Sequence, residues 1–202
     1  MDKNAIWRVA IFGGSFNPPH IAHLLAVTYA LATAPIDEVL VVPVYRHPFA
    51  KELASFEDRF EMCRLALAWI PGVRVSDVER VLGGESKTLR TLEHLLEHHP
   101  DWSLRLLLGA DVLADAPKWN RFDRVSELAP PILLGRAGVV GTRAPESVLP
   151  YVSSTEIREA LEAGDEETVR LKVPAAVIDY ITARGLYHRR GREDEEGSVR
   201  RQ

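Results

Sequence analysis

The chain has 202 residues, of which 46% are hydrophobic and 27% charged, and this balance excludes an intrinsically disordered protein. Its length favours a single domain with a substantial core. The formal net charge of −4, with lysines and arginines spread along the chain, disfavours a protein that binds duplex nucleic acid, so an anionic ligand requires a local site.

Four short apolar runs rich in branched residues predict strands. They span residues 9–12, 39–42, 104–108 and 132–134, and segments with helical periodicity separate them. Strands buried on both faces show such continuous apolar runs. The alternation predicts an α/β fold, a Rossmann-like doubly wound parallel sheet, in which ligands bind at the carboxyl ends of the strands where the strand order reverses.

Three helices are predicted between the strands. The second begins after Ser55 and spans 56–69, with Asp58 in the first turn, where the helix dipole favours an acid. Leucines at 89, 92, 95 and 96 indicate the third. The first is expected to bury one face formed by Ile21, Leu24, Leu25, Thr28, Leu31 and Ala32.

Two further helices are predicted near the end of the chain. Ser153 and Glu156 have the spacing of a capping box ahead of a helix over 157–163, which Gly164 ends. The last helix begins at Pro174 and ends at Gly185. It is expected to bury Val177, Ile178 and Ile181.

These helices form a small helical C-terminal portion of a single domain over residues 1–187. The remaining residues, 188–202, are nearly all polar and are expected to form a disordered tail. We expect a cytoplasmic protein: the only cysteine, Cys63, allows no intrachain disulfide, and neither a signal peptide nor an apolar run of about 18 residues is present.

The stretch Gly-Gly-Ser-Phe-Asn-Pro-Pro-His-Ile-Ala-His, residues 13–23, joins the first strand to the first helix. Gly13 and Gly14 let backbone N–H groups approach an anion, and the helix start adds free donors, so the stretch suits phosphate. It lacks the Gly-Lys-Ser/Thr of a P-loop and the third glycine of the dinucleotide fingerprint. The alternative is a turn whose histidines, His20 and His23, only cap the helix.

A second stretch, Val-Ser-Ser-Thr-Glu-Ile-Arg at 152–158, also suits a phosphate. Ser154 and Thr155 present hydroxyl and N–H groups at a helix start, and Arg158 adds a permanent cation one turn later. A capping box without a ligand would explain the same serines and threonine.

Both stretches resemble signatures of the nucleotidylyltransferase superfamily. The first resembles Gly-x-Phe-x-Pro-x-His-x-Gly-His, with Ala22 in place of the second glycine, and the second resembles Ser-Ser-Thr-x-Ile-Arg. The resemblance implies that His20, His23 and Arg158 are catalytic. It implies an ATP site that includes Gly13, Gly14, Ser15, Phe16, Ser154 and Thr155.

Residues 8–187 are similar to the nicotinate mononucleotide adenylyltransferases of NAD biosynthesis, through short segments that contain Asp111, Trp119, Arg136 and Tyr187. The resemblance implies that Asp111 lies beside the nucleotide, Trp119 by the pyridine ring and Arg136 on the acceptor phosphate. The alternatives are a helix cap for Asp111, a core position for Trp119 and a surface charge for Arg136.

The chain departs from this family on the acceptor side. Lys87 and Thr88 follow Ser86 where Ser-Tyr-Thr is common, Asn120 follows Trp119 where an aromatic residue is frequent, and the loop 43–51, ending at Lys51, only loosely matches Pro-Pro-His-Lys. Lys87, Thr88 and Lys51 are therefore candidate acceptor-binding residues, together with Trp119 and Arg136.

The resemblance implies transfer of AMP from ATP, with Mg²⁺, to nicotinate mononucleotide, which yields deamido-NAD and pyrophosphate. The alternatives are a related transferase that uses nicotinamide mononucleotide or phosphopantetheine or makes CDP-alcohols, and a non-catalytic nucleotide-binding module. Pyridine-side features such as Trp119 weigh against phosphopantetheine and CDP-alcohols, and the intact histidines and Arg158 weigh against a non-catalytic module. The choice between nicotinate and nicotinamide stays open. The sequence does not predict an oligomeric state.

Two other features have simpler interpretations. His94 and His98 are four apart on a predicted helix, but no carboxylate or cysteine motif accompanies them, so we expect a solvated helix face and no resident metal. Cys63 lies among apolar residues and is expected in the core and not as a nucleophile.

Overall fold

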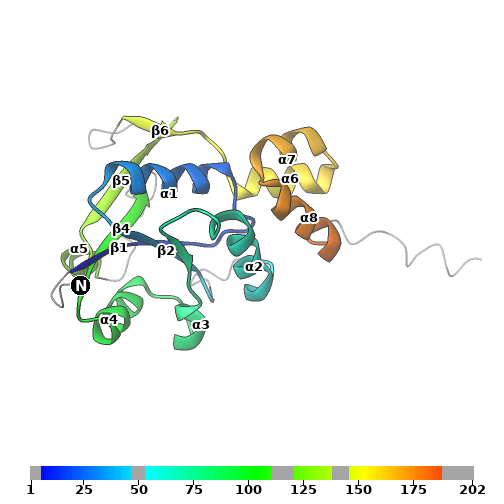
Figure 1. The fold of residues 1–202 in the computed structure, drawn as a ribbon. Helices are drawn as coiled ribbons and strands as arrows, with labels where there is room; N and C mark the ends of the chain where they lie inside the picture. The colour runs from blue at the N-terminus through cyan, green and yellow to red at the C-terminus, as the bar shows by residue number, and fades with distance from the viewer. Residues whose placement is uncertain (1–5, 47–52, 111–120, 138–145, 188–202) are drawn as a thin grey trace, which may run out of the picture.

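The structure is a computed structural model that describes residues 6–46, 53–110, 121–137 and 146–187. Its six strands form one sheet in the order β3-β2-β1-β4-β5-β6, and every neighbouring pair is parallel (Figure 1). The strands are β1 (Trp7–Gly14), β2 (Glu38–Pro43), β3 (Val73–Val75), β4 (Trp102–Gly109), β5 (Pro131–Arg136) and β6 (Ser147–Leu149). The helices are α1 (Ile21–Thr33), α2 (Phe56–Leu67), α3 (Val78–Leu82), α4 (Thr88–His98), α5 (Phe122–Leu128), α6 (Ser154–Ala163), α7 (Glu166–Lys172) and α8 (Ala175–Arg184).

The strand order confirms the predicted doubly wound α/β fold. From β1 the chain first builds one half of the sheet, through β2 and β3, and then crosses to β4 on the other side of β1. The order reverses between β1 and β4, where ligands of such sheets bind.

All four predicted strands are present. The three-residue strands β3 and β6 and the short helices α3, α5 and α7 were not predicted, because segments so short carry little periodicity.

Helices cover both faces of the sheet. Alternate strand residues point to opposite faces, so Ala10, Val39 and Val41 join one core with α1 and α2, while Val9 and Leu40 join another with α3, α4 and α5. Figure 1 shows α1 on one side of the sheet and α3 and α4 on the other. This double cover explains the continuous apolar runs of the strands.

The prediction for the buried face of α1 is wrong. Leu25, Thr28 and Ala32 are exposed, and Ile21, Leu24 and Leu31 are only partly buried. The buried residues are Ala22, Ala26, Val27 and Ala30. Because these side chains are small, α1 packs closely on the sheet, and Ala22 has a packing role there.

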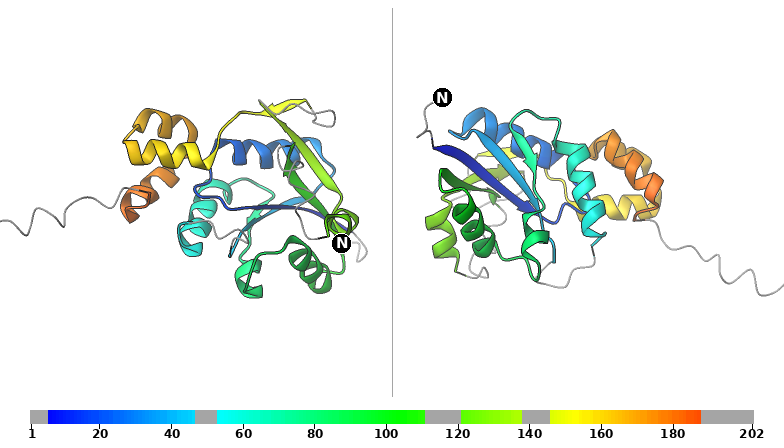
Figure 2. Two further views of the ribbon diagram at one scale, coloured as in Figure 1. Left: turned by 180° about the vertical axis from the view of Figure 1, so that it is seen from behind. Right: turned by 60° about the horizontal axis from the view of Figure 1, so that its bottom comes forward.

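The helices α6, α7 and α8 form a group beside α2, and Figure 2 shows this group from two further directions. The group is joined to α2 by the buried carboxylate of Asp58, which accepts hydrogen bonds from Tyr180 Oη at 2.9 Å and Arg184 Nε at 3.2 Å. Val177 and Ile181 are buried, as predicted, and Ile178 is partly buried. This confirms the predicted helical C-terminal portion.

The capping box predicted for α6 is half formed. Ser153 Oγ accepts a hydrogen bond from the backbone N–H of Glu156 at 3.2 Å, and Gly164 ends the helix in the left-handed conformation. The Glu156 side chain does not return to the cap but pairs with Lys172 of α7. Its contact therefore holds α6 and α7 together.

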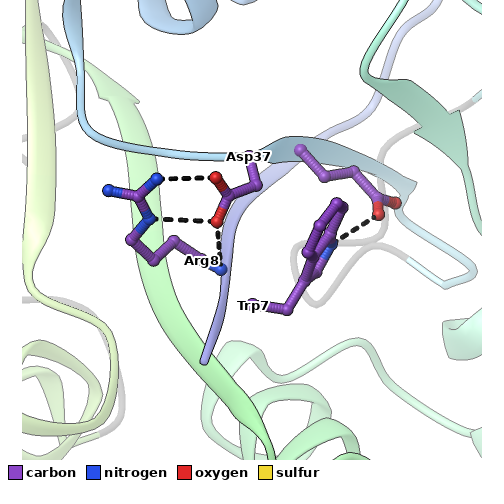
Figure 3. Close-up of polar contacts among 4 residues, drawn as sticks. Trp7, Arg8 and Asp37 are labelled. Carbon is purple, nitrogen blue, oxygen red and sulfur yellow. Dashed lines mark hydrogen bonds and ion pairs between the residues drawn. The ribbon is translucent and has the colours of Figure 1, made fainter. Parts of the chain in front are cut away.

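Polar contacts join β1 and β2 at the end of the sheet where these strands begin (Figure 3). Arg8 forms a two-pronged ion pair with Asp37, at 2.9 and 2.6 Å, and its backbone N–H donates to the same carboxylate. Trp7 Nε1 donates to Glu38 at 3.1 Å. These contacts support the register in which Val9 lies opposite Glu38.

No helix in the described ranges is long and apolar enough to cross a membrane.

Candidate functional site

The phosphate loop, residues 13–20, leaves the carboxyl end of β1 and leads into α1. The strand continues through Gly14, so the two glycines that open this loop are also the last two residues of β1. A methyl group on Gly14 would lie 3.0 Å from the ring of Phe16, which is buried and has a positive φ of 47°. A methyl group on the exposed Gly13 would meet nothing within 4 Å. Gly14 is therefore required for packing against Phe16, whereas the absence of a side chain at Gly13 leaves the backbone there accessible to a ligand.

His20, at the end of this loop, and His23, in the first turn of α1, are in direct contact. His20 is the last residue before α1 and is 3% exposed, and its backbone N–H donates to His23 Nδ1 at 3.0 Å. The rings stack with their centroids 3.7 Å apart. Because Nδ1 of His23 accepts a hydrogen bond, the proton of the neutral ring is on Nε2. The capping role considered for His23 thus exists, but it leaves the Nε2–H as a donor.

Both imidazoles are neutral at physiological pH. Burial lowers the pKa of His20 to about 3, and the nearby charge of Arg136 acts in the same direction. Burial also lowers the pKa of His23 well below its usual range, with contributions from His20 and Arg136. The pair therefore offers hydrogen bonds, while positive charge has to come from neighbouring arginines.

The second sequence motif packs directly on the phosphate loop. Ser154 Oγ donates to the backbone oxygen of Pro18 at 2.9 Å, across 136 residues of sequence. Arg158 Nη1 donates to the backbone oxygen of Asn17 at 2.8 Å, and Nη2 lies 3.3 Å from Thr155 Oγ1. The start of α6 and the start of α1 therefore belong to one site.

Arg136, the last residue of β5, lies in the same cluster. Its guanidinium donates to the backbone oxygen of Val152, lies 5.9 Å from the ring centroid of Tyr151, and is close enough to the histidines to lower the pKa of both. Arg136 is partly buried, so it is not the isolated surface charge considered as its alternative.

Two residues that support the loop were not predicted from the sequence. Arg59 is 1% exposed and donates to the backbone oxygens of Ser15 and Ala54, at 2.9 and 3.0 Å. Asn17 is 2% exposed, and its Oδ1 accepts from Ala54 N–H at 3.0 Å and Tyr187 Oη at 2.7 Å. Arg59 has no local signal, since it lies in a helix with many charged residues. Asn17 lies inside the first motif, but the signature leaves that position unspecified.

The acceptor-side candidates are only partly described. Lys87 is the residue before α4, and its side chain is 52% exposed, with Nζ 3.8 Å from Glu85 Oε2. Thr88 is the first residue of α4. Lys51, Asp111 and Trp119 lie outside the described residues, as do Asn120 and the tail 188–202.

The two features with simpler interpretations differ in outcome. Cys63 is fully buried and burial raises the pKa of its thiol, which confirms a core position. Near His94 and His98, however, a carboxylate is present after all: Glu97 shares their helix face, and the possible ligand atoms of the three lie within 4.8 Å of one another. His98 and Glu97 are exposed, in agreement with a solvated face.

A parallel sheet of this order, with a donor-rich loop at its reversal point, defines a nucleotide-binding α/β protein. The family model described as cytidylyltransferase-like matches residues 11–160. A protein of Anaeromyxobacter dehalogenans (strain 2CP-C), named "probable nicotinate-nucleotide adenylyltransferase", is 52% identical over 186 residues, which cover 89% of this chain and 96% of that protein. A protein of the same name from Myxococcus xanthus (strain DK1622) is 40% identical over 181 residues, covering 89% and 94%. The chain belongs to this nicotinate-nucleotide adenylyltransferase family.

The fold of the family is also found among solved structures. The structure of Plasmodium falciparum nicotinic acid mononucleotide adenylyltransferase complexed with NaAD matches with a TM-score of 0.77 at 22% identity. The match covers 90% of this chain and 97% of that chain. It confirms the arrangement of the sheet and helices.

Proposed function

We propose that this chain transfers AMP from ATP to nicotinate mononucleotide and produces deamido-NAD and pyrophosphate. The observation that carries the proposal is the contact between the two motifs, through Ser154 to Pro18 and Arg158 to Asn17, within a few residues of His20. These contacts gather donors from two distant parts of the chain around one anion-binding loop. Membership of the adenylyltransferase family supports the same reaction.

The reaction requires no nucleophile from the protein. An oxygen of the acceptor's 5′-phosphate attacks the α-phosphorus of ATP, and the bond from that phosphorus to the oxygen bridging to the β-phosphate breaks. Pyrophosphate leaves in line with the attacking oxygen and takes the electron pair of that bond. The protein's part is to align the two phosphates and to stabilise the charge on their oxygens.

The phosphate loop suits that task. We propose that the Nε2–H of His23 and the buried ring of His20 donate to triphosphate oxygens, together with backbone N–H groups of the loop and of the start of α6 and the hydroxyl of Thr155. The Ser154 hydroxyl donates its one hydrogen to Pro18 O and so holds the loop against α6. Within the described residues, His20 Nδ1 is buried without a hydrogen-bond partner, so its ring is not fully satisfied by the protein. Arg158 and Arg136 supply positive charge, Arg136 towards the acceptor phosphate.

Mg²⁺ is proposed to enter as part of the substrate, bound to ATP. Mg²⁺ prefers oxygen ligands, whereas the described side chains of the histidine and arginine cluster offer N–H donors. They therefore suit phosphate oxygens that the metal leaves uncoordinated. Asp111 beside the nucleotide, and Trp119 and Lys51 on the acceptor side, remain predictions from the family resemblance.

The test is pyrophosphate release from ATP and Mg²⁺ with a panel of nicotinate mononucleotide, nicotinamide mononucleotide and phosphopantetheine. We expect kcat/KM to be roughly ten- to hundredfold higher for nicotinate than for nicotinamide mononucleotide, because a charge-assisted hydrogen bond to the carboxylate is worth about 1.5–3 kcal/mol. Equal use of both pyridine acceptors would remove the preference, and turnover of phosphopantetheine alone would remove the proposed function.

Lys87→Met, measured with the same panel, tests whether this lysine reads the carboxylate. If it does, the preference falls in the variant. If the ratio stays unchanged, backbone N–H groups at the start of α4 read the carboxylate, which agrees with the half-exposed position of Lys87 beside Glu85.

A further inference from the structure

A buried carboxylate connects two segments on the acceptor side. Glu79 of α3 is 9% exposed, and its Oε2 accepts from the backbone N–H of Tyr45 at 3.1 Å and from the hydroxyl of Ser86. Its Oε1 lies 3.3 Å from Thr91 Oγ1 on α4. The carboxylate therefore contacts the segment after β2, the segment before α4, and α4 itself.

The same segments connect to the phosphate loop in one further step. Val44, next to Tyr45, donates its backbone N–H to Gly14 O at 2.9 Å. Ser86 strengthens the connection, since its Oγ accepts from Tyr45 N–H at 2.9 Å and its backbone N–H donates to Arg46 O at 3.0 Å. Hydrogen bonds on either side of the Val44–Tyr45 peptide link thus connect the phosphate loop to Ser86, the residue before Lys87.

Hydrogen-bond donors surround the carboxyl group of Glu79. Its three neighbours, one backbone N–H and two hydroxyls, can all donate, and a carboxylate can accept all three bonds. Burial raises the pKa of Glu79, while those donors and the charge of the buried Arg59 act against the increase. Arg59 holds Ser15 of the phosphate loop, so a buried polar side chain lies behind each half of the site.

We propose that Glu79 is a positioning residue for the acceptor, because it sets where the segment 86–88 lies relative to the phosphate loop. The proposal rests on the acceptor-binding role proposed for Lys87 and Thr88. Without the carboxylate, the segment would shift relative to Gly14, while the contacts of His20, Arg158 and Arg59 with the phosphate loop would be retained. Loss of Glu79 should therefore weaken acceptor binding much more than ATP binding.

Three variants of the full chain test this. Glu79→Ala removes every bond of the carboxylate. Glu79→Gln can retain them, because its oxygen can accept from Tyr45 and Ser86 while its amide donates to Thr91 Oγ1. Asp58→Ala is the matched control, since Asp58 is a carboxylate of similar burial, 6% exposed. Its side-chain partners are Ser55, at the start of its own helix, and Tyr180 and Arg184 of α8. KM for each substrate, kcat and Tm are measured for all three.

We expect Glu79→Ala to raise KM for the acceptor by about tenfold or more, because the buried donors of Tyr45, Ser86 and Thr91 lose their acceptor. KM for ATP should stay within about twofold of wild type. Glu79→Gln should stay within about threefold of wild type for both substrates. Asp58→Ala should lower Tm without changing the ratio of the two KM values. Equal increases in both KM values in Glu79→Ala, or no increase, would overturn the proposal.

A fourth variant keeps the test decisive if Glu79→Ala does not fold. Ser86→Ala removes only one hydroxyl from the partly buried segment, and we expect it to raise the acceptor KM by roughly three- to tenfold at nearly unchanged Tm. An unchanged acceptor KM would then overturn the proposal. All variants are measured with the acceptor that wild type uses best in the panel above. If nicotinate mononucleotide is not a substrate, that result contradicts the proposed function, while the Glu79 proposal is still tested with the other acceptor.

Discussion

At the scale of single residues, burial keeps both histidines of the phosphate loop neutral, although a cation would attract a triphosphate more strongly. Their rings stack at 3.7 Å, a distance at which two imidazolium ions would repel each other. The geometry supports the proposed division of two tasks, in which His20 and His23 give directed hydrogen bonds and Arg136 and Arg158 give charge. Arginine suits the second task because it stays charged in a partly buried site.

The first prediction concerns turnover. His20→Ala and His23→Ala should each reduce kcat by on the order of 10²- to 10³-fold, the usual cost of losing one aimed donor in such a site. The measurement is pyrophosphate release at saturating substrates, at a temperature where thermal melting shows that each variant is folded. Activity within about threefold of wild type in both variants would leave the histidines with a capping role only.

The neutral state of His20 also makes stability depend on pH. Its pKa is 6.5 in the unfolded chain and about 3 in the folded protein, so between these values only the unfolded state takes up a proton. The contribution of neutral His20 to the free energy of unfolding is fully present above pH 6.5, and it is lost as the pH falls towards 3. At pH 5 the loss from His20 alone is about 2 kcal/mol.

Urea unfolding at pH 7 and pH 5 measures this loss. His20→Gln cannot titrate, so its stability should fall less over this interval than that of wild type. His98→Gln is the control, because it makes the same substitution at an exposed histidine of α4. The same dependence in His20→Gln and wild type would mean that His20 titrates normally when folded.

At the scale of elements, the end of β1 combines a packing requirement with an open position. Gly14 lies against the ring of Phe16, which is part of the core beneath α1, whereas Gly13 faces open space. Phe16 in turn lies 5.5 Å from Phe12 and 4.9 Å from His23, measured between ring centroids. A change at Gly14 would therefore reach the histidine pair through the packing.

These two glycines give a matched pair of variants. Gly14→Ala should destabilise the fold by about 1–3 kcal/mol, because its methyl group would press on the buried Phe16 ring. Gly13→Ala should keep wild-type stability but raise KM for ATP, because its methyl group occupies space near the backbone donors. Thermal melting and KM for ATP are measured on both, and the prediction fails if Gly13→Ala loses as much stability as Gly14→Ala.

At the scale of the whole molecule, the C-terminal helices complete a site that begins at the first strand. Ser154 and Arg158 reach the phosphate loop from α6, and Tyr187, just after α8, reaches Asn17 of the same loop. Asp58 fixes α8 to α2 behind it. These contacts explain why the family resemblance continues to Tyr187.

The last prediction compares two changes at this end of the chain. Deleting residues 188–202 should leave Tm and turnover nearly unchanged, because that sequence has no apolar face with which to dock. Tyr187→Phe, which keeps the ring but loses the bond to Asn17 Oδ1, should lower stability by about 1 kcal/mol. Melting and pyrophosphate release test both, and a drop of more than a few degrees on deletion would show that the tail packs on the domain.

The sequence by itself determined the features whose signals are local. The apolar runs at 9–12 and 39–42 predicted strands, Ser55 and Gly164 marked helix ends, and the two motifs indicated the family. The same motifs gave His20, His23 and Arg158 as candidate phosphate-binding residues. Each of these signals lies within a few neighbouring residues, because strand alternation, capping and anion binding at a helix start are properties of short segments.

Only the tertiary structure decided which distant residues meet. The small residues of α1 face the sheet in place of its leucines, Arg59 holds the phosphate loop from α2, and Glu79 connects the segments at Tyr45 and Ser86. In a short or polar helix, the sequence does not distinguish a buried charged residue from a solvent-exposed one. Its burial depends on which loop packs over it, and that is settled by contacts between residues far apart in the chain.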